Sequence, residues 1–438
     1  MVILGAGMTG LAAARASGGT VYEAAAAPGG ICSSYYLAPG GVYRSGGVRR
    51  PSAARDDAYR FEVGGGHWIF GGDPDVLALI ETLGPTRRYA RRASVYFPED
   101  RRFVPYPLQN HLRHLGPALA ERALAEMEAA SGAAPLREGA TMREWLARSF
   151  GATLGALFFE PFHQLYTGGL HAHIAPQDGY KSPVDLAAVA AGVRGETLAA
   201  GYNVTFVYPP AGLDALARGL AEASAVEYGK RAVRIDPGRR EVAFADGETV
   251  AYEQLVSTLP LDRALAMTGL EAGPPDPYTS VLVLNVGAER GPTCPDDHWV
   301  YVPRSRAGFH RVGFYSNVDL AFLPVSAREG PTRVSLYVER AWPGDTRPEP
   351  GEVPRYTAAV TRELQDWGWI GAVEVADPTW IDVAYTWRWP GSRWRDDALR
   401  VLGAHGVQQV GRYGRWTFQG IADSIRDGLA VGAALRAG

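Results

Sequence analysis

The chain has 438 residues, of which 46% are hydrophobic and 21% charged, a balance typical of globular proteins with two or three structural units. Its net charge of −3 excludes a strongly basic surface of the kind that attracts nucleic acid or an acidic membrane. The two cysteines form no CxxC pair and no histidine cluster has ligand spacing, so we expect neither a disulfide framework nor a metal site. No apolar run reaches the ~18 residues of a membrane helix, and the N-terminal run lacks the basic flank of a signal peptide, so we expect a cytoplasmic protein without a membrane partner.

A glycine-rich turn near the N-terminus predicts a dinucleotide site. The segment Gly5-Ala-Gly7-Met-Thr-Gly10 follows a short apolar strand and precedes an Ala-rich helix. Gly5 permits the tight turn, Gly7 lets a pyrophosphate approach the backbone, and Gly10 lets the helix pack close to the strand. A second strand ends at Glu23, roughly 20 residues after the first glycine, where a carboxylate that binds ribose is expected. A plain strand–turn–helix is the alternative.

Two further glycine segments narrow this prediction to a flavin nucleotide. Gly29-Gly30 follows the ribose acid where flavin enzymes pass close to the second half of the dinucleotide, although a simple turn has the same composition. Three glycines, 64–66, leave the backbone bare before His67, which suits close approach to a flat ligand. We expect His67 to face the isoalloxazine ring; a solvated loop histidine is the alternative. Residues 37–60 have the composition of a long surface loop.

The next stretch is predicted to form a helix, a hairpin and then a helical region. The helix is expected over 73–83, with Asp73 as its cap, and the β-hairpin over 94–97 and 102–105. Residues 111–160 have a helical pattern that includes a capping box, Thr141-Met-Arg-Glu144.

Several polar residues in this half are candidates for a binding site. Gln109 and Asn110 directly follow a proline-fixed turn, where they would hold a polyol or, alternatively, belong to a helix cap. Lys181 is a lone cation in a loop, and by itself such a lysine is more often solvated than a ligand.

Short strands dominate the second half of the chain. Strands expected at 202–209, 226–228, 232–235, 241–244 and 254–257, with a helix over 212–221, fit a flavin domain interrupted by a helical insertion. Four more strands, at 279–287, 299–303, 308–316 and 332–339, predict an antiparallel sheet. Arg311 lies among aromatic residues in the third of these, so it either faces an anion or flavin or lies on the solvent face.

The chain closes with a second segment that fits a dinucleotide. A helix is expected over 426–437, and Asp423-Ser424 just before it would face the ribityl chain and pyrophosphate at the helix N-terminus.

These elements predict an α/β protein with a Rossmann-type FAD-binding domain, an inserted helical domain and an antiparallel β-sheet substrate domain. The expected FAD-binding domain comprises 1–88, 203–265 and 400–438. The helical domain is expected over 108–202, and the substrate domain over 89–107 together with 266–399.

The chain resembles the UDP-galactopyranose mutases, especially the eukaryotic type, within the flavin amine-oxidase-like and protoporphyrinogen-oxidase-like superfamily. The stretches that carry the resemblance lie in the same order along almost the whole chain. Besides the glycine segments above, they are Val104-Pro-Tyr-Pro107-x-Gln109-Asn110, Glu144-Trp145, Asn203-x-Thr-Phe206, Tyr301-x-Pro303, Phe309-x-Arg311, Phe314-x-Ser316-Asn317 and Gly411-Arg412-Tyr413-Gly414-x-Trp416 with Asp423.

The resemblance, added to the motifs above, implies a set of site residues. His67 and Arg311 would be catalytic. The FAD-binding residues would be Gly5, Gly7, Gly10, Glu23, Gly29, Gly30, Gly66, Val233, Arg412, Asp423 and Ser424. The substrate-binding residues would be Gln109, Asn110, Lys181, Asn203, Tyr301, Asn317, Trp389 and Phe418.

The same resemblance implies the chemistry. In that family the reduced FAD attacks the anomeric carbon through N5, a flavin–sugar adduct forms, and the sugar recloses with the other ring size, without net redox. The implied partner is a small-molecule glycosyl substrate, NAD(P)H is a candidate reductant, and a homodimer is compatible with the sequence.

The departures from the family pattern concern the phosphate pocket. Three family tyrosines are replaced by the Arg388-Trp389-Pro390 stretch, by Phe418 and by Val318. Each lost hydroxyl removes a hydrogen bond worth about 0.5–1.5 kcal/mol. The sequence therefore favours a pyranose–furanose mutase acting on a nucleoside or another glycoside of natural-product type, with a flat base stacking on Trp389. The alternatives are an oxidase or dehydrogenase of the amine-oxidase type, acting on an amine or sugar alcohol, and a flavin-fold binding or scaffolding protein.

Overall fold

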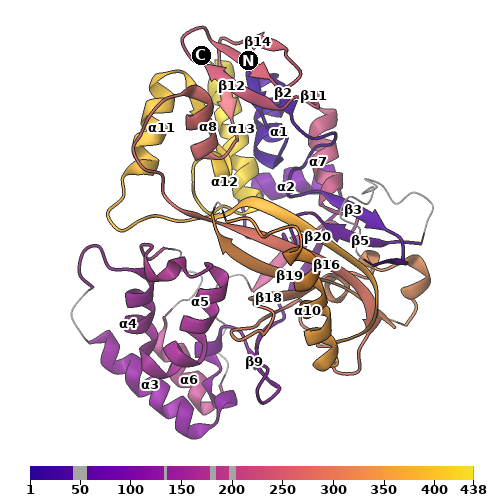
Figure 1. Cartoon of the computed structure of the whole chain (residues 1–438), viewed down its shortest axis with the longest axis vertical. Helices are drawn as coiled ribbons and strands as arrows, with labels where there is room; N and C mark the ends of the chain where they lie inside the picture. Colours follow the sequence, from indigo (N-terminus) through magenta and orange to yellow (C-terminus); the bar gives the residue numbers. More distant parts are fainter. Residues whose placement is uncertain are drawn as a thin grey trace.

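A computed structural model describes residues 1–42, 57–132, 136–177, 184–196, 204–330, 332–344 and 346–437. The fold is mixed α/β, and three layers follow one another along its longest axis (Figure 1). A parallel sheet with its helices lies at the top, a large mixed sheet crosses the middle, and a group of helices lies at the lower left (Figure 1). Lys181 and Asn203, two of the predicted substrate residues, lie outside the described residues, as does most of the loop predicted over 37–60.

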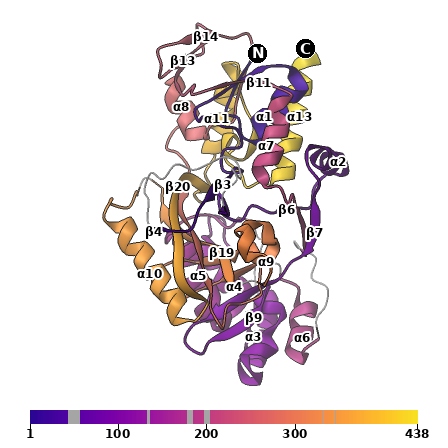
Figure 2. The ribbon, with the colours of Figure 1, turned by 90° about the vertical axis from the view of Figure 1, so that its right-hand side faces the viewer.

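The five-stranded parallel sheet carries the glycine-rich turn. Its strand order is β11-β2-β1-β15-β21, and each neighbouring pair is parallel. The strands are β1 (Val2–Leu4), β2 (Thr20–Glu23), β11 (Ala225–Tyr228), β15 (Leu255–Ser257) and β21 (Val407–Gln409). Two groups of helices flank this sheet, with α1 (Met8–Ser17), α7 (Leu213–Glu222) and α13 (Ile421–Ala437) in one and α8 (Leu261–Thr268) and α11 (Trp394–Ala404) in the other (Figure 2).

The first and last helices, α1 and α13, pack with their backbones in close approach. A Cβ atom at Gly428 or Gly432 would overlap the carbonyl oxygens of Thr9 and Ala13. The last helix begins at Ile421, earlier than the predicted start at Arg426, so Asp423 lies in its first turn. A carboxylate in that position is stabilised by the helix dipole, which accounts for the earlier start.

The large sheet has eight strands in the order β4-β20-β16-β19-β18-β17-β8-β9. The strands are β4 (Gly41–Val42), β8 (Ala93–Phe97), β9 (Arg102–Pro105), β16 (Tyr278–Arg290), β17 (Trp299–Tyr301), β18 (Arg311–Phe314), β19 (Arg333–Pro343) and β20 (Ile370–Thr386).

This sheet differs from the antiparallel sheet expected from the sequence in two ways. The β4–β20 and β8–β17 pairs are parallel. In each pair one strand, β4 or β8, comes from the N-terminal part of the chain. The strand expected over 308–316 spans just β18 and passes directly into a short helix, α9 (Tyr315–Val318). The long strand β20 and the helix α10 (Glu352–Asp366), which lies against it, were not predicted.

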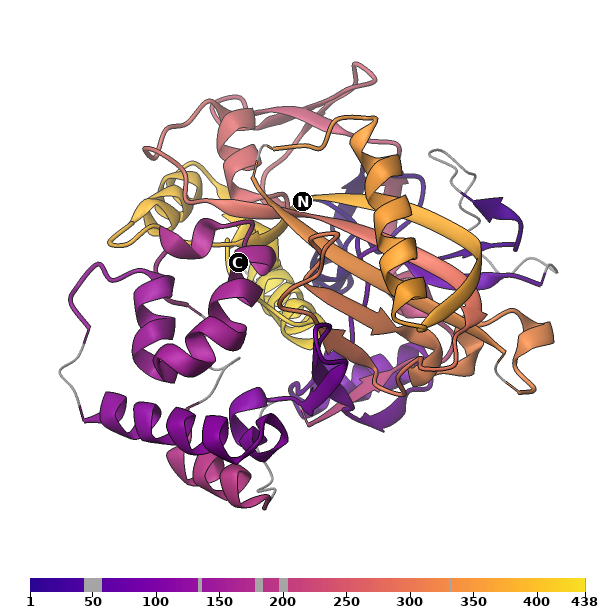
Figure 3. The same cartoon turned by 60° about the horizontal axis from the view of Figure 1, so that its bottom comes forward.

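The helical layer contains α3 (Pro117–Ser131), α4 (Met142–Leu154), α5 (Glu160–Tyr166) and α6 (Leu186–Arg194), seen from below in Figure 3. A π-helical turn, η3 (Gly155–Phe159), joins α4 to α5. The capping box at Thr141 and Glu144 is confirmed, since the threonine side chain accepts from the Glu144 backbone N–H and the Glu144 carboxylate accepts from the Thr141 N–H.

The remaining elements are short. The helix predicted over 73–83 is confirmed as α2 (Pro74–Leu83), capped by the Asp73 side chain. Three smaller sheets pair β6 (Ile69–Phe70), β10 (Thr205–Tyr208) and β7 (Arg87–Ala90); β12 (Ala232–Asp236), β13 (Glu241–Phe244) and β14 (Thr249–Ala251); and β3 (Ser34–Leu37) with β5 (Tyr59–Glu62). The short helices are α12 (Gly411–Gly414), η1 (Leu108–Asn110), η2 (Leu112–Leu115), η4 (Leu170–Ala172), η6 (Leu320–Phe322) and η7 (Val325–Ala327). Within the described ranges, every helix is too short or too polar to cross a membrane.

A buried carboxylic acid lies at the end of β5. The Glu62 side chain is fully buried, and its oxygens accept hydrogen bonds from the Ser34 hydroxyl at 2.9 and 3.0 Å and from the Tyr208 hydroxyl. Burial raises the pKa of Glu62 to about 7, although the positive charge of Arg60 and these hydrogen bonds act to lower it. Because the usual pKa is 4.5, the folded protein binds this proton more tightly than the unfolded chain.

This proton makes the stability of the fold depend on pH. The contribution is fully present below pH ~4.5 and is lost as the pH rises through about 7, each pKa unit being worth about 1.4 kcal/mol. Glu62→Gln removes the titration, so we expect wild type to lose thermal stability relative to this variant between pH 5 and about 8. Melting temperatures of both proteins across that range measure the difference, and parallel curves would contradict the assignment.

Candidate active site

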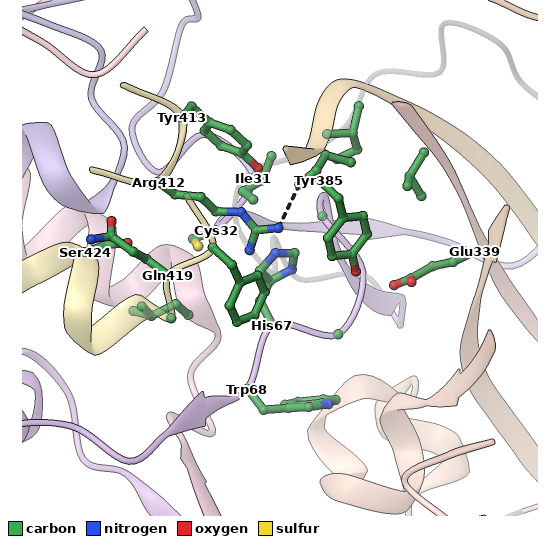
Figure 4. Close-up of a pocket in the computed structure, with 18 of the residues that line it drawn as sticks. Ile31, Cys32, His67, Trp68, Glu339, Tyr385, Arg412, Tyr413, Gln419 and Ser424 are labelled. Atoms are coloured by element: carbon green, nitrogen blue, oxygen red, sulfur yellow. Dashed lines mark hydrogen bonds between the residues drawn. The ribbon is translucent and has the colours of Figure 1, made fainter. Parts of the chain in front are cut away.

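One cavity of about 710 Å³ lies where the three layers meet. Its lining includes glycines of the N-terminal turn, strands of the large sheet, and aromatic residues of α4, η3 and α5. In Figure 4, the side chains of Arg412, Tyr385 and His67 converge on this space, and Glu339 approaches it from the opposite side. The cavity therefore brings together parts of the chain that are far apart in the sequence.

The N-terminal glycines form one end of the cavity. Gly7 and Gly29 are bridged as neighbouring parallel segments, and the Gly29 N–H donates to the Ala6 carbonyl at 2.8 Å. Gly5, with φ 97°, and Gly30, with φ 57°, take backbone conformations that favour glycine. A Cβ atom at Gly7 would meet no protein atom within 4 Å, so its backbone borders open cavity. Gly10, in contrast, does not line the cavity, because its Cα faces the Gly5 carbonyl oxygen.

Glu23 reaches the same end from β2. Its carboxylate accepts hydrogen bonds from the backbone N–H groups of Ala6 at 2.7 Å and Ala25 at 2.8 Å. Each oxygen retains a second lone pair, and the side chain lines the cavity. The Glu23 carboxylate is therefore held in place by these two N–H groups and can accept hydrogen bonds from ribose hydroxyls.

The C-terminal residues complete this end. Arg412 donates from Nη2 to the Ala384 carbonyl at 2.7 Å, and its guanidinium lies 4.7 Å from the Phe418 ring centroid (Figure 4). Asp423 and Ser424, in the first turn of α13, also line the cavity. The bare backbone at Gly7, the ribose acid and the start of α13 fit an FAD molecule. These residues would hold its pyrophosphate and ribose, while Arg412 would lie near its flavin half.

His67 lies between the two ends of the cavity. Its Nδ1 is 3.3 Å from the Gly65 carbonyl oxygen, and the preceding Gly66 backbone lies directly against the Tyr337 ring. Burial and the positive charge of Arg412 lower the pKa of His67 to about 4. The ring is therefore neutral at ordinary pH, which suits packing against a flat ligand.

Arg311 and Glu339 form a buried ion pair at the sheet end of the cavity. The Arg311 Nε donates to one Glu339 oxygen at 3.0 Å, and Nη2 donates to both oxygens at 2.6 Å. Burial acts to raise the pKa of Glu339, but Arg311 and the nearby His310 outweigh it and lower the pKa to about 2. Among the described residues, no protein group is bonded to the Arg311 Nη1, so this amino group is left for a ligand.

The register of the sheet fixes this pair beside Tyr301. Tyr301 of β17 pairs with Arg311 of β18, and Arg311 pairs with Glu339 of β19. All three line the cavity, so they form a row across adjacent strands. Phe418, the remaining predicted substrate residue on the cavity wall, lies over Arg412 instead.

Besides Gly10, five of the predicted site residues do not line the cavity within the described part of the chain: Gln109, Asn110, Val233, Asn317 and Trp389. The first two are buried in η1, which packs against α6. Val233 is 49% exposed at a bulge of β12, where Ala232 and Arg234 shift register.

The other two are held by the backbone. The Asn317 amide donates to the Pro295 and Asp297 carbonyls at 2.9 and 2.7 Å. Trp389 is 38% exposed, and its indole N–H donates to the Pro275 carbonyl at 3.2 Å.

Sequence reasoning missed Glu339, His310 and the aromatic residues of α5. Glu339 ends the stretch 332–339, in which Arg333 is also charged, so its residue type alone did not mark it as the partner of Arg311. Phe162 and Tyr166 lie in an aromatic-rich stretch whose composition is typical of a buried core, yet both line the cavity.

The glycine turn gives a matched pair of variants. Gly7 has φ −72° and ψ 174°, which alanine adopts freely, so Gly7→Ala should leave the fold intact while its methyl group occupies the ligand's space. We expect its FAD content to fall at least tenfold with an unchanged apoprotein melting temperature. Gly10→Ala would overlap the Gly5 carbonyl and should destabilise the apoprotein itself by about 1–3 kcal/mol. Flavin-to-protein absorbance and thermal unfolding measure both effects; equal behaviour of the two variants would refute the distinction.

The titration midpoint of His67 should lie well below the ordinary pKa of a histidine, 6.5. In ¹³C-histidine NMR of the purified protein we expect its midpoint near pH 4, since burial and Arg412 disfavour the charged ring. His67→Gln identifies the resonance by its loss, and a midpoint above 6 would show that the ring is not held in its neutral form.

The fold has counterparts among solved structures. The crystal structure of reduced UDP-galactopyranose mutase matches with a TM-score of 0.85 and 22% identity, covering 100% of this chain and 94% of that chain. Putrescine oxidase bound to putrescine matches with a TM-score of 0.57 and 16% identity, over 100% and 98% of the two chains. A fatty acid isomerase from P. acnes that produces CLA matches with a TM-score of 0.56 and 15% identity, over 98% and 97%. At these identities the likenesses establish the fold.

The sequence itself matches a family model. Residues 8–434 match the model described as flavin containing amine oxidoreductase, a span that runs from α1 almost to the end of α13. The glycine turn, Glu23 and Arg412, from widely separated parts of the matched span, all line the same cavity. The chain therefore belongs to the FAD-binding family of flavin-containing amine oxidoreductases.

Proposed function

We propose that this protein is an FAD-dependent pyranose–furanose mutase that acts on a nucleoside or another glycosyl substrate rather than on UDP-galactopyranose. The observation that carries the proposal is that one cavity joins the dinucleotide cradle to the unpaired edge of Arg311. When bound and reduced, the flavin supplies the nucleophile for the anomeric carbon. A small sugar between the two ends would contact both.

Arg311 supplies a positive charge to the reaction and hydrogen-bond donors that point in a fixed direction. Glu339 engages Nε and Nη2, so the guanidinium plane is fixed and the two Nη1 hydrogens are directed to one place. These hydrogens stabilise negative charge that develops on an oxygen of the sugar or leaving group. Because His67 is neutral, it adds no second positive charge that would compete with Arg311.

The arrangement also favours a sugar over an amine. A substrate ammonium group can donate hydrogen bonds but not accept them, so it finds no partner at the Arg311 Nη1. Oxygen atoms of a glycoside do accept them. Amine oxidation nevertheless remains the second candidate, because the matching family is described by that activity.

The structural likenesses support the same choice. The TM-score is 0.85 for the reduced UDP-galactopyranose mutase and 0.57 for putrescine oxidase. Over the whole chain, the backbone therefore follows the mutase more closely than the amine oxidase.

The test separates isomerisation from oxidation. The holoprotein, reduced anaerobically with dithionite or NAD(P)H, is incubated with candidate pyranosides, and the products are separated by chromatography. We expect isomers of unchanged mass with reduced protein and none with oxidised protein. Peroxide release, or bleaching of the oxidised flavin by substrate, would instead establish an oxidase.

Variants of the ion pair assign the residues. Arg311→Ala should lower kcat at least 10²-fold with FAD still bound, because a charge-stabilising donor is lost. Glu339→Gln should lower kcat less, since it releases the guanidinium without removing it. Arg400→Ala, at an exposed ion pair of α11, is the matched control and should keep full activity. Near-normal turnover by Arg311→Ala would refute the role given to Arg311.

A further inference from the structure

The part of the cavity on the other side of Arg311 from the dinucleotide end carries little net charge. Among the described residues, the cations in the cavity lining are Arg91, Arg311 and Arg412, matched by the carboxylates of Glu23, Glu339 and Asp423. Arg311 is neutralised by Glu339, while Arg412, Glu23 and Asp423 belong to the dinucleotide end. Arg91 remains, and its Nη2 donates to the Tyr106 carbonyl at 3.2 Å.

Aromatic rings make up the wall of this region. We call it the aromatic compartment, lined by Tyr106, Trp145, Phe158, Phe162, Tyr166 and Tyr301. The Tyr301 ring lies 4.8 Å from Tyr106 and 5.4 Å from Phe162, centroid to centroid. Phe162 is in turn stacked on Phe158 at 5.1 Å and on Tyr166 at 5.6 Å. The rings form a continuous apolar wall from the sheet to α5.

The sheet register places this wall next to the reaction point. Tyr301 and Arg311 are direct partners on adjacent strands, and neighbouring strands lie about 5 Å apart. Both side chains line the cavity, so they are neighbours on its wall. An aglycone attached to a sugar beside Arg311 would therefore lie next to Tyr301.

We propose that the aromatic compartment binds an uncharged, planar aromatic aglycone, so that the substrate is a neutral nucleoside-like glycoside and not a nucleoside diphosphate sugar. This inference rests on the proposed mutase function. A base gains binding energy by stacking on aromatic side chains, whichever base it is. A diphosphate would bring two or more charges into a region that has a single described cation, and an unpaired buried charge is strongly unfavourable. Trp389, the surface expected from the sequence to stack on a base, lies outside the cavity lining, and the compartment takes over that role.

The chemistry balances with such an aglycone. The bond between the anomeric carbon and the aglycone breaks, and its electron pair leaves with the aglycone. After the sugar has changed ring size, the same atom of the aglycone bonds again to the anomeric carbon. No oxidant is consumed, and the compartment retains the departed ring by stacking until it returns.

The experiment compares three ligands that share one base. Binding of uridine, UMP and UDP to the holoprotein with oxidised flavin is measured by isothermal titration calorimetry at physiological ionic strength. We expect the Kd of uridine to be at least tenfold lower than that of UDP, with UMP between them. Phe162→Ala should weaken uridine binding at least fivefold, and Phe162→Leu provides a second variant that preserves volume if the first does not fold. Tyr228→Ala, at an exposed tyrosine of β11, is the control and should bind as wild type.

The outcomes separate this inference from the mutase function. UDP binding more tightly than uridine, absence of uridine binding up to millimolar concentration, or unchanged binding by both Phe162 variants would overturn the aromatic-aglycone inference. A mutase acting on nucleotide sugars would survive these results. Tight uridine binding with no isomer formed by the reduced protein would refute the mutase and leave the compartment in place.

Discussion

The site depends on two opposite charges buried side by side in the large sheet. Taking a guanidinium and a carboxylate out of water costs several kcal/mol each, and only their close pairing offsets this. Arg311 and Glu339 achieve it on neighbouring strands, with three hydrogen bonds between them. The ion pair engages the Nε and Nη2 groups of the guanidinium and leaves Nη1 to the cavity. A one-residue slip of β18 would turn Arg311 to the opposite face of the sheet. The presence of Arg311 in the cavity therefore depends on the strand register.

Around this pair, the cavity is divided by polarity. The dinucleotide end presents backbone groups, a ribose acid and Arg412, whereas the far end presents aromatic rings from the sheet and from α5. His67 separates the two and is neutral because burial and Arg412 disfavour its charged form. Charged and backbone groups therefore gather at one end of the cavity, and aromatic rings gather at the other. Both ends are anchored in sheets, and this holds them at a fixed separation.

Features that depend on neighbouring residues were predictable from the sequence, and features that depend on register were not. The turn at Gly5, the cap at Asp73 and the capping box at Thr141 follow from residues a few positions apart. Glu339 could not be identified as the partner of Arg311, because their pairing is set by the alignment of β18 with β19. Trp389 and Val233 were placed by analogy with a family pattern, but the loop and the bulge that carry them direct them elsewhere. The aromatic residues of α5 had the composition of a core, and composition cannot distinguish a core from a cavity wall.

The contact between α1 and α13 has a consequence for the order of events in the cell. The cradle at Gly7 is shared with Arg412, Asp423 and Ser424, which are translated hundreds of residues later. A growing chain that already contains the glycine turn therefore lacks Arg412, Asp423 and Ser424 until the start of α13 has been synthesised. Until then the parallel sheet is also missing its edge strand β21. Unpaired strand edges and exposed apolar surface favour aggregation, so completion of the cavity and burial of these strands are late and simultaneous events in synthesis.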